Sequence, residues 1–320
     1  MIFWILLLVF ALVYVLTPWV IALSWRIGAV DVPGDPRRLH RKKIPRCGGI
    51  AVFLGVLAGT FLLGERSLYT ERVLWGSALM LAVGLFDDIR CLRAGTKLCL
   101  QLAISLWTVM GCGAFSTYGE AAFAVFWLVL LSNAHNFIDG MDGLLAGCAG
   151  CEGLLLGGCL LLLGEGGLWQ ISWILSAALL SFRLYNRYPA EIFAGDCGSG
   201  SVGFLLGALS LPLFSAPVFS FFNLSPLFLF AYPLCDLATS VLRRLLHGKS
   251  PFAADRAHLH HRLYAKGLEQ ADCSMLLTSV SIGLGGVGLF LCDRALWSCA
   301  AVASLGAVLL LIYLRKRLEV

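Results

Sequence analysis

The stretch 81-LAVGLFDDIRCLRAGTK-97 joins an apolar run directly to two adjacent aspartates and then to a short basic segment. The apolar run begins near Val73, and no polar spacer separates it from Asp87 and Asp88. One aspartate at the end of a membrane helix is unremarkable, because a charge is far less costly there than at the centre of the bilayer. Two aspartates, with Lys97 at the start of the next apolar segment, indicate a cluster of carboxylate and ammonium groups at a membrane surface.

The whole chain shares the apolar character of this stretch. Hydrophobic residues make up 59% of it and charged residues only 13%, with a mean hydropathy of +0.85. This composition excludes an ordinary soluble domain. Since a hydrocarbon core about 30 Å thick needs about 20 residues per helix, the pattern predicts an all-α, polytopic membrane protein with about eleven transmembrane helices. Their approximate ranges are 1–24, 48–64, 73–86, 98–112, 120–135, 144–163, 168–185, 201–214, 222–242, 273–292 and 295–314.

The basic residues predict the orientation of the chain in the membrane. Of the 24 Lys and Arg residues, all except Arg66, Arg72 and Arg294 fall on one side if the N-terminus is outside. Because Lys and Arg gather in cytoplasmic loops, we expect an external N-terminus and a cytoplasmic C-terminus. The net charge of +5 then reflects membrane topology and not a nucleic-acid-binding surface. Without an internal repeat or linker, residues 1–320 are expected to form a single domain.

Polar residues collect in the predicted cytoplasmic segments, whereas the external loops are short and chemically plain. Clustering on one face favours an enzyme that works at the inner membrane surface. The alternatives are a transporter or flippase of a lipid-linked or anionic substrate, which would carry polar residues near the midplane, and a catalytically silent scaffold. The expected site is built from segments 25–47, 87–97, 133–147, 183–200 and 243–272.

The first of these segments includes the loop 31-DVPGDPRRLHRKKIPRCGG-49, which has a basic centre and ends in a glycine pair. Its charge alone suits an anchor to anionic lipid. His40, Pro45 and the two glycines instead favour a loop that contacts phosphate, because backbone can approach a ligand closely at a glycine.

The segment 133-NAHNFIDGMDGLLAG-147 carries the most specific pattern. Asn133 and Asn136 are three residues apart, as are Asp139 and Asp142, so each pair would share one face of a helix. A glycine follows each aspartate and indicates a tight turn or a close backbone approach. A purely structural role would have to explain four oxygen-bearing side chains within ten residues.

The segment 186-NRYPAEIFAGDCGSGSVG-203 links Asn186 to Asp196 and leads into a Gly- and Ser-rich turn. Carboxylate and amide oxygens suit a hard cation such as Mg²⁺, which usually keeps waters and shares the phosphates of a substrate. The turn also offers backbone N–H groups to an anion at the start of a helix.

The segment 255-DRAHLHHRLYAKG-267 places three histidines beside an arginine. No cysteine partner or HExxH spacing accompanies them, so phosphate binding or proton handling fits this cluster better than a zinc site. Its members are His258, His260, His261 and Arg262.

In this order, the five segments resemble the motif set of the polyprenyl-phosphate N-acetylhexosamine-1-phosphate transferases (glycosyltransferase family 4), membrane enzymes that start bacterial envelope glycan synthesis. The resemblance covers residues from about 31 to 267. The stretch 255-DRAHLHHRL-263 is similar to the branch that begins O-antigen, common-antigen and teichoic-acid linkage units. It lacks the run of three histidines and an acidic residue that marks phospho-N-acetylmuramoyl-pentapeptide transferase.

The resemblance implies an activity and its partners. Such enzymes transfer a sugar 1-phosphate from a UDP-N-acetylhexosamine, most commonly UDP-N-acetylglucosamine, to undecaprenyl phosphate and release UMP. They depend on Mg²⁺, with Mn²⁺ as a substitute, and work at the cytoplasmic face of the bacterial inner membrane. The identity of the sugar, the polysaccharide pathway and the oligomeric state, including a homodimer, stay open.

The resemblance also assigns roles to residues of this chain. Asp196 would be a metal ligand with Asn136 close to the metal, and Asp87 and Asp88 would lie at the reaction centre. The implied substrate-binding positions are Lys43, Asp139, Asp142, Asn186, His258, His260, His261 and Arg262. Lys97 is expected to bind substrate too, as the ammonium group beside Asp87 and Asp88.

The residue inventory agrees with this chemistry. Attack of a lipid phosphate on a pyrophosphate brings several negative charges together, which a metal ion and basic groups must neutralise. Either Asp87 or Asp88 removes a proton before direct attack, or an aspartate attacks and forms a phospho-enzyme. Direct attack is favoured because a phosphate monoester is largely ionised near neutral pH. His135, where the family has an apolar residue, is expected to pack in the interior.

Overall fold

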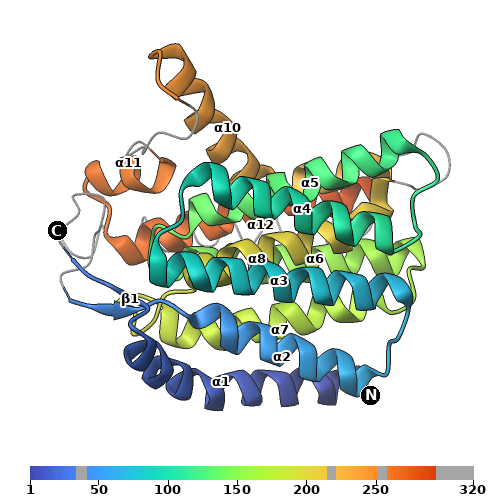
Figure 1. Cartoon of the computed structure of the whole chain (residues 1–320), viewed down its shortest axis with the longest axis horizontal. Helices are drawn as coiled ribbons and strands as arrows, with labels where there is room; N and C mark the ends of the chain where they lie inside the picture. The colour runs from blue at the N-terminus through green and yellow to red at the C-terminus, as the bar shows by residue number, and fades with distance from the viewer. Residues whose placement is uncertain (34–41, 215–220, 251–257, 293–320) are drawn as a thin grey trace.

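The computed structural model describes residues 1–33, 42–214, 221–250 and 258–292, and this part of the chain is nearly all helical (Figure 1). The expectation of an all-α protein is therefore confirmed. The predicted span 295–314, the loop residues 34–41 with His40, and residues 251–257 lie outside the described residues.

Most of the helices lie side by side in one bundle (Figure 1). From α2 to α8, short loops join successive helices and reverse the direction of the chain, so every second junction lies at the same end of the bundle. The bundle helices are α1 (Ile2–Ile27), α2 (Gly48–Leu63), α3 (Leu68–Arg90), α4 (Ala94–Gly111), α5 (Tyr118–Ile138), α6 (Leu144–Leu163), α7 (Leu168–Asn186), α8 (Gly195–Phe214) and α12 (Gln270–Cys292).

The remaining elements are short, apart from one helix that projects from the bundle. Strands β1 (Val30–Asp31) and β2 (Ile44–Pro45) pair antiparallel between α1 and α2. After α8 come the 3₁₀ helix η1 (Phe221–Leu224), α9 (Ser225–Leu229), the projecting α10 (Ala231–Leu246) and α11 (Leu259–Ala265). Figure 1 shows β1 and α11 at the end of the bundle opposite to the N-terminus.

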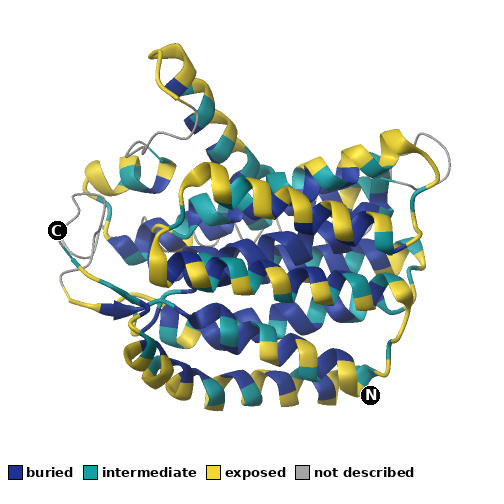
Figure 2. Cartoon of the chain, viewed as in Figure 1, coloured by how far each residue is buried: buried dark blue, intermediate teal, exposed yellow. Residues whose placement is uncertain are grey.

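Helix α8 forms the centre of the bundle and is buried along nearly its whole length (Figure 2). It packs mainly against α3 and α5. Its small residues allow this close packing, and the indole Nε1 of Trp127 on α5 donates a hydrogen bond to Ser210 Oγ at 2.9 Å. Because α8 is fixed on several sides, its first turn has a defined position at the end of the bundle.

The outward faces are apolar, as expected of a protein in lipid. On α1, for example, Phe3, Trp4 and Trp19 are exposed. Figure 2 shows exposed positions all along this helix. Among the described helices, α1, α5, α6, α8 and α12 are long and apolar enough to cross a membrane, and α2 is a shorter apolar helix. The protein is thus a multi-pass membrane protein, while the number of about eleven spans and the sides of the termini stay predictions.

The structure corrects the predicted bounds at three places that matter for the site. Helix α3 continues to Arg90, so Asp87 and Asp88 lie within its last turn. Helix α8 begins at Gly195 and not at residue 201, so Asp196 lies in its first turn. The range 222–242, predicted as one span, is divided into η1, α9 and α10. Pro233 explains the break after α9, because it has no N–H to donate to the carbonyl of Leu229.

Candidate active site

Asp88, Asp196 and Arg46 meet where the last turn of α3 faces the first turn of α8. One guanidinium nitrogen of Arg46, Nη2, lies 2.8 Å from Asp88 Oδ1 and 3.2 Å from Asp196 Oδ2. The other, Nη1, lies 3.7 Å from Asp31 Oδ1. Burial alone would lower the pKa of the Arg46 guanidinium, but the carboxylates of Asp88 and Asp196 hold this pKa above its ordinary value. Arg46 is therefore a fixed positive charge between two carboxylates.

Lys97 forms a second bridge between the same two helices. Its Nζ lies 2.9 Å from Asp87 Oδ2 and 3.0 Å from Asp196 Oδ1. The other oxygen of Asp87 accepts a hydrogen bond from the backbone N–H of Leu92 at 2.7 Å. The predicted cluster of Asp87, Asp88 and Lys97 is thus real, and Asp196, distant in sequence, is its centre.

Asp88 also holds the N-terminus of α8. Its Oδ1 accepts the backbone N–H of Asp196 at 3.0 Å, and its Oδ2 accepts that of Cys197 at 3.1 Å. The first N–H groups of a helix have no partner within the helix, and a carboxylate there is favoured by the helix dipole. The Asp88 side chain is 0% exposed, whereas that of Asp87 is 10% exposed. Asp87 is therefore the more accessible of the pair.

Glycine at position 195 allows Arg46, which follows β2, to lie close to the start of α8. Gly195 has φ 75°, in the left-handed region, and a Cβ there would lie 2.6 Å from Asp88 Oδ2 and closer still to the carbonyl oxygen of Arg46. The same loop is joined to the segment before α8 by hydrogen bonds from Gly48 N to Phe193 O and from Gly49 N to Ala194 O, both 3.0 Å. The glycine pair thus lies against the backbone of this segment, and its approach to a ligand stays a prediction.

Asn136 and Asp139 face this cluster from the end of α5. The amide Nδ2 of Asn136 donates to Asp196 Oδ1 and, at 2.8 Å, to Ser199 Oγ. Burial, and then the charge of Asp196, raise the pKa of Asp139 well above its usual range. Asn133 points elsewhere, with its Nδ2 donating to Gln101 Oε1 at 2.8 Å. Only the second asparagine of the predicted pair reaches the cluster.

Asp142 and Asn186 join the neighbouring turn to the loop after α7. Asp142 Oδ2 accepts the backbone N–H of Ala190 at 2.9 Å. Asn186 is buried, and its amide donates to Ile192 O at 2.9 Å and accepts the N–H of Gly143 at 3.2 Å. Both the oxygen and the nitrogen of the Asn186 amide therefore bind backbone groups, and a contact of Asn186 with substrate stays a prediction.

The predicted histidine cluster lies at the start of α11, next to the same turn. His260 packs against Gly140, where a Cβ would lie 2.7 Å from His260 Nε2. His260 is 1% exposed, and burial, followed by the charges of His261 and His258, lowers its pKa to about 3. His260 is therefore neutral near physiological pH. Arg262 is exposed on α11.

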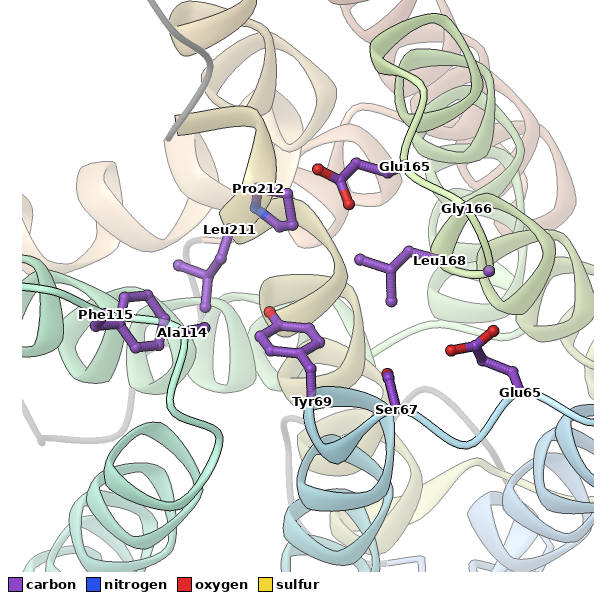
Figure 3. A pocket seen from close by; sticks show the side chains of 11 residues that line it. Glu65, Ser67, Tyr69, Ala114, Phe115, Glu165, Gly166, Leu168, Leu211 and Pro212 are labelled. Atoms are coloured by element: carbon purple, nitrogen blue, oxygen red, sulfur yellow. The ribbon is translucent and has the colours of Figure 1, made fainter.

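A cavity of about 900 Å³ adjoins this end of the bundle. Two predicted substrate-binding residues, Lys43 and Asp142, line it together with aromatic side chains of Trp25, Tyr188 and Tyr264. Its volume lies within the usual range for small-molecule sites. A second cavity, of about 530 Å³, lies between other loops and is lined by Glu65, Tyr69 and Glu165 (Figure 3). None of the predicted site residues lines this second cavity.

Two residues of this end escaped the sequence interpretation. Arg46 is one of several basic residues in its loop, and no sequence signal distinguishes it from its neighbours. Asp236, which contacts His258 Nδ1 through Oδ2 at 2.8 Å, carried a usable signal. An aspartate inside a predicted apolar span is rare enough to suggest a function by itself.

The donor chemistry of the cluster fits Mg²⁺. Within the described part of the chain, no three His, Cys, Asp or Glu side chains are arranged to hold a metal by themselves. Mg²⁺ does not need such a cage, because it usually binds through one or two carboxylates, waters and substrate phosphates. Four carboxyl groups gather here, those of Asp87, Asp88, Asp139 and Asp196. Burial and neighbouring negative charge raise the pKa of Asp139, and a cation bound among these groups would offset that charge.

Fold and site together define a multi-pass membrane enzyme whose charged cluster lies at one end of its helix bundle. Residues 72–214 match the sequence profile of glycosyl transferase family 4. The matched range contains most of α3 and the whole of α5 and α8. The chain is 32% identical over 308 residues to the probable undecaprenyl-phosphate N-acetylglucosaminyl 1-phosphate transferase of Bacillus subtilis, covering 89% of this chain and 83% of that protein. It belongs to glycosyl transferase family 4, and the predicted resemblance is confirmed.

Other relatives agree with this assignment. The decaprenyl-phosphate N-acetylglucosaminephosphotransferase of Mycolicibacterium smegmatis is 31% identical, with 82% of this chain and 75% of that protein covered. The undecaprenyl-phosphate alpha-N-acetylglucosaminyl 1-phosphate transferase of Salmonella typhi is 30% identical, with 82% and 77% covered. The chain is therefore a transferase, as the sequence predicted.

Proposed function

We propose that the protein transfers N-acetylhexosamine 1-phosphate from a UDP-sugar, most simply UDP-N-acetylglucosamine, to undecaprenyl phosphate and releases UMP. The observation that carries this proposal is the convergence of Asp87, Asp88 and Asp196 on the cations Arg46 and Lys97. The names of the relatives support the lipid acceptor and the sugar. The product would begin an envelope polysaccharide of the O-antigen, common-antigen or teichoic-acid type.

In the proposed reaction, an oxygen of the lipid phosphate attacks the β-phosphorus of the UDP-sugar. The bond from this phosphorus to the bridging oxygen breaks, and UMP leaves with that oxygen. Arg46 and Lys97 are placed to offset the negative charge of both substrates, because each lies between two carboxylates that fix its position. A pre-positioned charge needs no reorganisation when charge develops in the transition state.

Asp87 and Asp88 receive different roles in this scheme. Both oxygens of Asp88 accept hydrogen bonds from the α8 backbone, and Oδ1 also contacts Arg46. Asp88 therefore holds Asp196 in place. Asp87 is more accessible and is the better candidate to accept a proton from the lipid phosphate. This assignment addresses the choice between the two aspartates that the sequence left open.

Mg²⁺, or Mn²⁺ in its place, would be held by Asp196 with Asn136 beside it. Bound there, the metal would supply charge neutralisation for the pyrophosphate. The Nδ2 of Asn136 donates to Asp196 Oδ1 and to Ser199 Oγ on α8, so the chain orients the Asp196 carboxylate and the Asn136 amide in advance.

The nucleotide of the donor would occupy the cavity of about 900 Å³. Lys42 and Lys43 offer charge for phosphate, and the aromatic rings of Trp25, Tyr188 and Tyr264 offer faces on which a base can stack. His258, His260, His261 and Arg262 would meet the sugar or its phosphate. A cavity at the same end of the bundle as the charged cluster suits a substrate with an aromatic base at one end and a pyrophosphate at the other.

The site would face the cytoplasm of a bacterium, with the rest of the chain spanning the inner membrane about eleven times. The basic residues of the predicted inner loops support this orientation. Residues 1–320 would form one transferase domain, and association into a homodimer is compatible with the proposal.

The test is a transfer assay with a panel of donors. Purified protein, undecaprenyl phosphate, Mg²⁺ and radiolabelled UDP-N-acetylhexosamines should yield labelled lipid and UMP. Excess chelator should stop the reaction, and Mg²⁺ or Mn²⁺ should restore it. Absence of transfer with every donor would contradict the proposal, and activity that resists chelation would contradict the metal assignment.

A further inference from the structure

Asp236 is a buried acid that belongs to none of the five motif segments. It lies on α10, within a range predicted as an apolar span, and its side chain is 1% exposed. A charged group in such a position is costly unless it is paired and hydrogen-bonded. Its partners should therefore explain why the chain places it there.

Both oxygens of Asp236 are used at the start of α11. Oδ2 lies 2.8 Å from Nδ1 of His258, and Oδ1 accepts the backbone N–H of Leu259 at 2.9 Å. An ionised carboxylate only accepts hydrogen bonds, so the ring proton of neutral His258 must lie on Nδ1. The second nitrogen, Nε2, then carries a lone pair.

The surroundings of His258 connect this pair to the reaction centre. Its ring meets the edge of Phe137 at a centroid distance of 5.2 Å and stacks on His260 at 5.6 Å. Phe137 directly follows Asn136, whose amide contacts Asp196. The His258 side chain keeps 11% of its surface exposed, so its ring is not sealed off from a ligand.

His260 offers a contrast within the same cluster. It is buried, and neither of its ring nitrogens has a hydrogen-bond partner among the residues that the structure describes. His260 thus lacks a group that fixes its tautomer, whereas His258 has one. The two neighbouring histidines are therefore not equivalent, although the sequence presents them as one motif.

We propose that Asp236 is a positioning residue for the transfer reaction, which fixes His258 in the Nδ1–H tautomer so that Nε2 accepts a hydrogen bond from a hydroxyl group of the donor sugar. This arrangement follows the general rule that a second group orients a catalytic or ligating histidine. The inference rests on the proposed function, because the contact of His258 with substrate belongs to it.

The kinetic test uses Asp236→Asn with Ser240→Ala as its matched control. The asparagine keeps an oxygen for the N–H of Leu259, but its Nδ2 donates to His258 Nδ1 and moves the ring proton to Nε2. The kcat should fall about 10- to 100-fold, with little change in KM or thermal stability. Ser240 Oγ lies 3.2 Å from the same nitrogen, so Ser240→Ala should stay within about twofold. A kcat of Asp236→Asn within twofold of wild type would overturn the proposal.

A spectroscopic test separates this proposal from the proposed function. Protein labelled with ¹⁵N-histidine contains six histidines, and His258→Gln identifies the signal of His258. At alkaline pH, wild-type protein should show a protonated Nδ1 and an unprotonated Nε2, and Asp236→Asn should show the reverse. A proton on Nε2 in the wild type contradicts the role of Asp236, whether or not the protein transfers sugar phosphate. Failure of wild-type transfer with the expected tautomer instead contradicts the proposed function alone.

Discussion

At the scale of single residues, the two adjacent aspartates of α3 have different partners and different roles. Asp87 and Asp88 point to different partners because successive residues of a helix are about 100° apart. Asp88 faces α8 and is fully withdrawn from solvent, while Asp87 faces Lys97. One carboxylate therefore holds the start of α8, and the other pairs with Lys97 and is the more exposed of the two.

Replacing Asp88 by asparagine should abolish most activity without preventing membrane insertion. The amide removes the counter-charge of Arg46 and one acceptor from the α8 N-terminus. Hydrogen bonds to charged groups contribute about 1.5–3 kcal/mol, so the transfer rate should fall about 100-fold or more. The control is Asp31→Asn, which removes a longer contact of 3.7 Å to Arg46 and should cost less than about tenfold. Similar losses in the two variants would refute the special role of Asp88.

Gly195→Ala should lower both stability and transfer. A left-handed conformation costs a residue with a Cβ about 1–2 kcal/mol, and the added atom would also displace Arg46 or Asp88. Gly200→Ala is the matched control on the same helix, because a Cβ there meets nothing within 4 Å. It should stabilise the protein by about 0.5–1 kcal/mol. Thermal unfolding in detergent and the transfer assay measure both effects, and equal behaviour of the two variants would be inconsistent with this geometry.

The sequence predicted the acidic residues of the site better than the basic residue between them. Paired aspartates at the end of an apolar run are conspicuous, and Asp196 stands beside a Gly- and Ser-rich turn. Arg46 was not predicted, because its position depends on the pairing of β1 with β2, in which Asp31 faces Ile44. Such a pairing is a tertiary feature that residue types alone do not reveal.

At the scale of helices, His135 and Glu152 form a buried polar pair between α5 and α6. His135 Nε2 lies 2.9 Å from Glu152 Oε2, and Ser281 on α12 donates to Glu152 Oε1 at 2.8 Å. The expectation that His135 packs in the interior is consistent with its complete burial. The network joins α5, α6 and α12 at the residue that precedes Asn136 in the chain.

His135→Phe should destabilise the protein by about 3–5 kcal/mol, because it removes the partner of Glu152 Oε2 in the interior and leaves only the contact of Oε1 with Ser281. The double variant His135→Phe with Glu152→Leu should recover most of that loss, since it removes both polar groups. Thermal unfolding of the single and double variants gives the coupling energy between the two sites. Additive effects of the two substitutions would contradict the pair.

The ends of a helix could be predicted where glycines in the sequence mark them. They could not be predicted where tertiary contacts determine the first or last turn. Helix α6 occupies the predicted range 144–163, bracketed by Gly143 and Gly164. Helix α8 begins six residues before the predicted start at 201. Its first turn is rich in glycine and serine, which alone favours a loop, but Asp88 accepts the N–H groups of Asp196 and Cys197 and stabilises helix there.

At the scale of the molecule, the charged cluster and the cavity of Figure 3 lie between different sets of loops. The proposed orientation places Glu165 outside and Glu191 in the cytoplasm. In a background without native cysteines, a membrane-impermeant maleimide should label Glu165→Cys in intact spheroplasts. It should label Glu191→Cys only after permeabilisation. The reverse pattern would contradict the proposed topology.

The central claim is that the cluster of Asp87, Asp88, Asp196, Arg46 and Lys97 transfers a sugar together with its phosphate. The most direct measurement follows the β-phosphate of UDP-N-acetylglucosamine, labelled with ³²P, in the presence of undecaprenyl phosphate and Mg²⁺. We predict that the label enters the lipid in step with the release of unlabelled UMP, and that Asp196→Asn prevents both. Label that stays in the aqueous nucleotide, or full transfer by Asp196→Asn, would contradict the account.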